Sequence, residues 1–241
     1  MDKINKFKFS LEVLEYFNKQ TRSILKPNLI GLEGIQKGNF ELHYNITLSL
    51  SERSLLDIVL SELQEKGLIQ SAYRDIGCRG EDLIITDKGR KALEKRTLDK
   101  LDELLLSVSA DINLIDLRYG AYEAILYKQT DWQRQVSTSL VELINHTLRT
   151  ISPDEEIKSR DWFVPSKDSK SGITRKHRIR YFIEEKKAMG SKSSKEVVNE
   201  IWNLLEACKD KLENIKHTND TYDEAEQIIN LVEVALMNLL N

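Results

Sequence analysis

The sequence predicts a mainly α-helical protein, in which an N-terminal α+β part with one short β-hairpin is followed by an all-α bundle. Apolar residues recur at helical spacing along most of the 241 residues, and a hairpin pattern occupies residues 68–86. Only ten Gly and three Pro interrupt these patterns. We expect the first part to cover residues 1–96 and the bundle to cover residues 97–241.

The composition is that of a soluble globular chain, with 40% hydrophobic residues and a formal net charge of −3. No run of about 18 apolar residues occurs, and charges interrupt the first twenty residues, so we expect neither a membrane span nor a signal peptide. Cys78 and Cys208 are far apart, which gives no support for a disulfide framework or a cysteine zinc site. We expect a cytoplasmic location.

The first strong element is a helix over residues 51–65. It begins after Ser49 and ends before Gly67, and its apolar positions form one stripe: Leu55, Leu56, Val59, Leu60 and Leu63. Earlier helices are expected over residues 9–26 and about 28–45, with the state of residues 31–40 left open.

A hairpin and another helix follow this stripe. Leu68 and Ile69 form one short β-prone run, residues 83–86 form the second, and a glycine-containing polar stretch connects them. A helix then begins at Asp87. This order, over about residues 40–95, resembles the winged helix-turn-helix domains of many bacterial regulators.

In a DNA-reading domain of this type, the second helix of the motif presents basic or amide side chains to base edges. The helix over residues 51–65 offers Arg53 but four carboxylates, whereas Arg74 and Arg79 lie at the expected tip of the hairpin. We name Arg53, Arg74 and Arg79 as candidate nucleic-acid contacts. Protein docking or dimerisation remains the alternative role of this domain.

Helical stripes continue through the second part of the chain. They run from Leu98 to Val108, from Tyr119 to Leu126, from Trp132 to Leu148, from Val197 to Ile215 and from Ala225 to Leu239. Amphipathic helices bury such stripes against one another, which predicts a bundle. Cys208 lies on a stripe and is therefore expected in the core. Arg134 and Ser139 are expected to hold the bundle together.

Residues 158–195 stand out by charge. They contain 12 basic and 4 acidic residues, a net charge of +8, between segments with net charges of −6 and −7. Such a basic loop attracts polyanions, and Lys167, Lys170, Lys176 and Arg180 are its candidate nucleic-acid contacts. The alternative is a solvated loop that neutralises the acidic helices beside it.

A series of single residues in the bundle carries a family resemblance. It comprises Arg118-Tyr119-Gly120-Ala121, Asp131 to Gln135, Ser139 to Leu143, Ile151 to Asp154, Thr174 to Tyr181 and Lys216-His217-Thr218. Over about residues 110–241 the chain resembles the predicted nuclease domains associated with prokaryotic PIWI modules, which occur in bacterial conflict and anti-phage systems. Val141 departs from the pattern, where an Arg is expected. The resemblance implies nuclease activity.

Cleavage of a phosphodiester needs a base, an acid and cations around the phosphate. Arg175, Arg178 and His217 can supply these without a metal if the segment before Tyr181 folds against residues 215–222. His177 is a second candidate, although its basic neighbours disfavour its protonated form. The alternatives are that His217 complements a helix dipole and that both arginines form salt bridges with the acidic helices.

Other chemistries have no support in the sequence. The four histidines show no HxH, HxxxH or HExxH spacing, and no GxxxxGK[ST] or GxGxxG motif occurs. We expect no metal and no cofactor.

Two functions stay open. The first is a nucleic-acid-binding effector or accessory protein of a bacterial anti-phage defence system, acting on DNA or RNA with a protein partner encoded nearby and as a metal-independent nuclease. The second is a winged-helix transcriptional regulator whose helical part dimerises or senses a ligand, without enzyme activity. A homo-oligomer is compatible with both.

Overall fold

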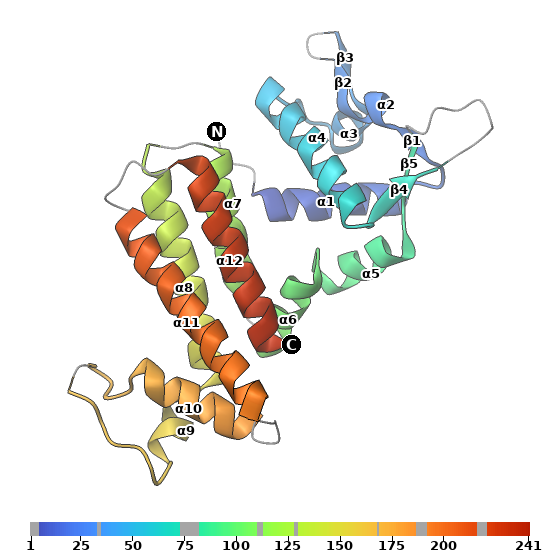
Figure 1. The fold of residues 1–241 in the computed structure, drawn as a ribbon. Coiled ribbons are helices and arrows are strands. Elements are labelled where there is room, and N and C mark those ends of the chain that lie inside the picture. The colour runs from blue at the N-terminus through green and yellow to red at the C-terminus, as the bar shows by residue number, and fades with distance from the viewer. Residues whose placement is uncertain are drawn as a thin grey trace. The chain divides into compact units, whose positions relative to one another are not determined.

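The computed structural model describes residues 5–241, except residues 33–34, 73–81, 110–112, 128–129, 168, 187–191 and 216–220. The chain divides into two compact units, Met1–Lys100 and Leu101–Asn241, which we describe one at a time. Figure 1 shows a small sheet among the helices of the N-terminal unit and a bundle of long helices in the second.

In its described residues, the N-terminal unit combines five helices with two small antiparallel sheets. Its helices are α1 (Lys6–Lys19), α2 (Lys26–Ile30), α3 (Asn39–Tyr44), α4 (Leu50–Glu65) and α5 (Asp87–Lys95). The larger sheet has the order β1-β5-β4 and consists of Ile24–Leu25, Asp82–Ile85 and Ile69–Ser71. The mainly α fold with a winged-helix-like start agrees with the prediction.

Helix α4 begins where the sequence predicts it to begin. The Ser49 side chain accepts a hydrogen bond from the Glu52 backbone N–H, and the Glu52 carboxylate accepts one from the Ser49 N–H. This reciprocal cap satisfies amide groups that have no partner inside the helix. After α4, strand β4 pairs with β5 so that Ile69 lies opposite Ile85.

The stretch of residues 31–40, whose state the sequence left open, forms a second hairpin. Strand β2 (Gly31–Leu32) pairs with β3 (Gln36–Lys37), and α3 begins two residues later. Gly31 has a φ of +71°, and a Cβ there would lie 2.3 Å from the Gly38 nitrogen. The hairpin therefore depends on glycine at this point.

Within its described residues, the second unit consists of helices and the segments that connect them, without a strand. Its helices are α6 (Lys100–Val108), α7 (Asn113–Leu126), α8 (Trp132–Ile151), α9 (Asp154–Lys158), α10 (Arg175–Lys186), α11 (Lys192–Ile215) and α12 (Tyr222–Leu240). Helices α7, α8, α11 and α12 lie side by side as the main bundle (Figure 1). Trp132 and Tyr222 stack at 4.5 Å between ring centroids and join the starts of α8 and α12.

A buried ion-pair network links three helices of the bundle. Arg118 on α7 donates to Asp102 on α6 at 2.6 Å and to Glu233 on α12 at 2.6 Å. The Tyr119 hydroxyl is 3.2 Å from the second carboxylate oxygen of Asp102. Arg118 and Asp102 are buried, so each charge depends on the other for compensation.

The sequence predicts a basic loop over residues 158–195, but the structure shows that part of this segment is helical. Residues 175–186 form α10, and α11 already begins at Lys192. The connection from α9 to α10 packs on a small core of its own, in which Trp162 and Phe163 contact Ile157, Ile173 and Tyr181. These apolar contacts explain why a stretch with so many charges folds.

Cys208 is buried in the bundle, as predicted from its position on an apolar stripe. Within the described ranges, no helix is long and apolar enough to span a lipid bilayer.

Candidate functional site in the helical unit

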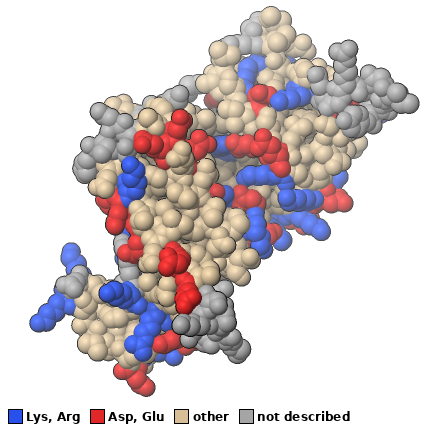
Figure 2. All heavy atoms as spheres, viewed as in Figure 1, with Lys and Arg blue, Asp and Glu red and all other residues tan. Residues whose placement is uncertain are grey.

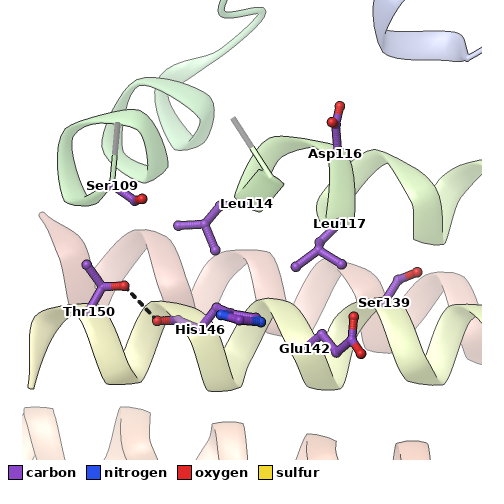
Figure 3. Close-up of a pocket in the computed structure, with 8 residues that line it drawn as sticks. All are labelled: Ser109, Leu114, Asp116, Leu117, Ser139, Glu142, His146 and Thr150. Atoms are coloured by element: carbon purple, nitrogen blue, oxygen red, sulfur yellow. Dashed lines mark hydrogen bonds between the residues drawn. The ribbon is translucent and has the colours of Figure 1, made fainter. Parts of the chain in front are cut away.

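A groove with a volume of about 480 Å³ lies against one face of α8 and contains acid–base side chains. Its lining residues come from the C-terminal end of α6, from α7 and from α8: Ser109, Leu114, Asp116, Leu117, Ser139, Glu142, His146 and Thr150. Figure 3 shows these side chains, with Leu114 and Leu117 of α7 facing α8.

Helix periodicity explains why α8 supplies four of these residues. Ser139, Glu142, His146 and Thr150 follow one another at intervals of three or four residues, which places them on one face of the helix. The opposite face carries apolar residues such as Leu140 that fill the bundle core. The polar face is therefore left for the groove.

Gly120 of α7 lies next to Ser139, one of the groove residues on α8. A Cβ at Gly120 would lie 3.4 Å from the Ser139 hydroxyl oxygen, at the edge of ordinary contact. Gly120 and Ser139 belong to two of the sequence stretches that carry the family resemblance. These stretches, about twenty residues apart in the chain, meet at this groove.

His146 and Glu142 are the groove residues best placed for proton transfer. Both are exposed, and side chains four residues apart on a helix lie next to each other. Figure 3 shows the His146 ring directed along α8 toward Glu142, whereas Asp116 points away from α8. An imidazole can both accept and donate a proton near neutral pH, and a neighbouring carboxylate can stabilise its protonated form.

The groove provides proton transfer but not charge compensation. None of its lining residues is a lysine or arginine. Among the residues that the structure describes, no group of three or more His, Cys, Asp or Glu side chains is arranged to hold a metal ion. Cations for a bound phosphate would have to come from outside the groove.

Of the three predicted catalytic residues, the structure describes only the Arg178 side chain. It donates to the Ser152 carbonyl oxygen at 2.6 Å and to Asp154 at 2.5 Å, while the Ser152 hydroxyl donates to the Arg178 carbonyl oxygen at 3.1 Å. These contacts attach α10 to the end of α8 and the start of α9. Arg178 therefore has the salt-bridging role that the sequence left open as its alternative.

The other two predicted catalytic residues are not described in full. Arg175 is the first residue of α10, but its side chain lies outside the described part, and His217 lies outside the described residues entirely. Their convergence on one phosphate therefore stays a prediction. His177, the second candidate, accepts a hydrogen bond at Nδ1 from the Thr174 N–H at 3.1 Å, and its ring packs on Phe163.

The predicted nucleic-acid contacts of the basic segment lie at the surface. Lys167, Lys170 and Lys176 are exposed, and so is Arg180 on α10. The Arg180 guanidinium lies over the Trp162 ring at 4.3 Å and pairs with Glu184 at 2.9 Å. Figure 2 shows Lys and Arg side chains over this part of the helical unit.

Arg53 is an exception among the predicted contacts. Its side chain is buried, pairs with the buried Glu41 at 2.7 Å and donates to the Ile30 carbonyl oxygen at 2.6 Å. This arginine links α2, α3 and α4, and its buried side chain is not accessible to a nucleic acid. The expectation that Arg53 contacts nucleic acid is therefore corrected. Arg74 and Arg79 lie outside the described residues.

Sequence reasoning did not assign the groove to any chemistry. The sequence pattern predicts a role for Ser139 within the bundle, and His146 has no partner at the spacing of a zinc motif. The available signal was the polar stripe of residues 139, 142, 146 and 150 on an otherwise apolar helix. Its partner wall from α7 could not be inferred from spacing along the chain.

The fold and the groove define a helical domain with proton-transfer groups and an adjoining basic segment. Residues 106–239 match the family model described as "Predicted pPIWI-associating nuclease". This match covers more than half of the chain, which therefore belongs to that family. Neither the curated proteins nor the solved structures include a match to the chain.

Proposed function

We propose that this protein cleaves nucleic acid, with His146 and Glu142 transferring protons in the groove of the helical unit. The observation that carries the proposal is that an exposed imidazole and carboxylate share a groove within the matched nuclease region. One group takes the proton from the attacking hydroxyl or water, and a protonated group returns a proton to the leaving oxygen as the P–O bond breaks.

The exposed cations of the basic segment support binding of the phosphate backbone. Helix α8 leads from the groove to this segment, because Ser152 at its end contacts Arg178 of α10. With a rise of about 1.5 Å per residue, His146 and Ser152 are separated by about 9 Å along the helix. Helix α10 is thus attached to α8 less than two turns beyond His146, and none of the residues lining the groove is a lysine or arginine.

The N-terminal unit is proposed to be a winged helix-turn-helix domain that docks a protein partner. Arg53 is the single Lys or Arg within α4, and it is buried. The exposed face of α4 therefore has no cation for base edges or phosphates, which disfavours sequence reading by this helix. We further propose a cytoplasmic role in bacterial antiviral defence, with the docked partner encoded nearby.

The test is a cleavage assay with the full chain on labelled single-stranded RNA, single-stranded DNA and duplex DNA, with and without EDTA. His146→Ala is expected to reduce the rate at least about hundredfold, the usual range for loss of an acid–base group. Glu142→Gln should reduce it by a smaller factor. Thr138→Ala, at an exposed α8 position outside the groove, serves as the matched control.

The same assay separates the two candidate histidines. If His217→Ala abolishes cleavage and His146→Ala does not, the site is the predicted one with Arg175 rather than the groove. If the full chain cleaves none of these nucleic acids, the enzyme proposal fails. A footprint on palindromic DNA that vanishes when Arg74 and Arg79 are replaced would then support the transcriptional regulator.

A further inference from the structure

A second hollow, of about 380 Å³, lies between α10 and α11 on the basic segment. It is lined by Lys176, Ile179, Arg180, Ile183, Glu184 and Asn199. The lining thus combines two apolar side chains with charged and amide side chains. This surface differs from the α8 groove, because it contains cations and no histidine.

Arg180 is held in a fixed orientation at the edge of this hollow. Its guanidinium lies over the Trp162 ring, and its Nε donates to one carboxylate oxygen of Glu184 at 2.9 Å. The Trp162 indole N–H donates to the other oxygen of Glu184 at 2.6 Å. Within the described residues, the hydrogen bond of the Arg180 guanidinium is made through Nε, so its terminal nitrogens can still donate to a ligand.

The chemistry of a nucleotide matches this lining, which contains apolar side chains, a guanidinium, an ammonium and an amide. A base has flat apolar faces and hydrogen-bonding edges, and its phosphate suits the fork of an arginine. Proteins that hold single strands combine such cations with surfaces on which bases lie flat. In a duplex the bases are stacked and paired, so only its phosphates could contact this hollow.

We propose that the hollow between α10 and α11 binds one unpaired nucleotide, so that single-stranded nucleic acid is the ligand class of this protein. The phosphate contacts Arg180 and Lys176, the base lies on Ile179 and Ile183, and Asn199 contacts the base edge. This inference rests on the proposed function, in which the helical unit acts on nucleic acid. Charge complementarity selects a nucleic acid over an uncharged ligand.

The test measures fluorescence anisotropy of labelled 20-nucleotide poly(dT) and poly(U) and of a duplex of the same length, in EDTA and before cleavage is detectable. Arg180→Lys keeps the charge but loses the flat fork, and Asn199→Ala removes an exposed amide with little risk to the fold. Each is expected to weaken single-strand binding by about three- to tenfold. Asn199→Ala should leave duplex binding unchanged, and Arg180→Lys should weaken duplex binding by a smaller factor than single-strand binding, because a duplex can reach Arg180 only with its phosphates. Lys170→Ala, a cation outside the hollow, should weaken both classes equally.

Equal losses for single strand and duplex, or no loss, would overturn the inference, and so would displacement of the bound strand by an acidic peptide at comparable concentration. Failure of the cleavage proposal gives a different result. In that case wild-type protein would still prefer single strands and lose that preference in the Arg180 and Asn199 variants, but no variant would cut them.

Discussion

Arg178 and Asp154 form an ion pair with an N–O distance of 2.5 Å, which connects the middle of the basic segment to the first turn of α9. The Arg178 side chain is only 11% exposed. The same guanidinium caps the Ser152 carbonyl at the end of α8. The sequence suggests Arg178 as a phosphate ligand, but its guanidinium already binds Asp154 and the Ser152 carbonyl oxygen.

Arg178→Ala should therefore lower stability rather than act on chemistry directly. Losing charged hydrogen bonds of this kind costs about 2 kcal/mol, and Arg178→Lys should recover part of that cost. Thermal unfolding followed by circular dichroism measures the loss, with Lys176→Ala as an exposed control on the same helix. A fully stable Arg178→Ala protein without cleavage activity would instead restore Arg178 as a catalytic candidate.

Gly120 provides a test of how closely α7 and α8 must approach beside the groove. A Cβ would just reach contact with the Ser139 hydroxyl, so Gly120→Ala should be neutral or gain up to about 1 kcal/mol from its better helix propensity. Gly120→Leu should cost about 1–3 kcal/mol because the larger side chain forces the helices apart. Urea unfolding compares the two variants, and equal stability would show that the helices do not meet here.

Much of the fold could be predicted from the sequence because its signals are local. Ser49, three residues before Glu52, indicates the start of α4, and the stripe that follows it indicates the buried face. The hairpin of residues 31–37 escaped prediction because its strands are two residues long. The close approach of Gly31 to the backbone of Gly38 depends on the three-dimensional fold and is not visible in the sequence.

The candidate site was less accessible to sequence reasoning because its contacts join distant residues. The exposed lysines could be identified from the local charge alone. Arg178 binds Asp154, which is 24 residues away in the sequence, and Arg53 donates to the carbonyl oxygen of Ile30, which is 23 residues away. Nothing in the charge pattern separates the buried Arg53 and the partly buried Arg178 from the exposed Arg180, since burial is decided by tertiary packing.

The pKa of Glu184 gives a pH-dependent test of the Trp162–Glu184–Arg180 contact. Burial raises this pKa, but hydrogen bonds from Arg180 and Trp162 and the nearby guanidinium charges outweigh it, so the carboxyl pKa lies below its usual value of 4.5. A depressed pKa means that the contact stabilises the fold above the usual pKa and is lost as the pH falls through the lower one.

An NMR titration of the side-chain carboxyl carbons measures this directly, with Glu184→Gln to identify the signal. We expect the midpoint for Glu184 below 4.5, and we expect Arg180→Ala to move it upward. A midpoint at or above 4.5 in the wild-type protein would show that Arg180 does not hold this carboxylate in solution.

Cys208 is expected to report on opening of the bundle. It is buried, and burial raises the pKa of its thiol above 9.0, so the reactive thiolate is disfavoured in the folded protein. The raised pKa also means that the folded state loses stability as the pH rises past the ordinary pKa of a thiol, because the unfolded chain then ionises first.

Iodoacetamide labelling in a Cys78→Ser background measures this protection. At pH 8.5, Cys208 should be labelled at least about tenfold more slowly than in denaturing urea, since labelling requires an opening event that costs at least about 1.4 kcal/mol. Cys208→Ala in the same background gives the blank, and rapid labelling of the native protein would mean that the bundle opens readily around α11.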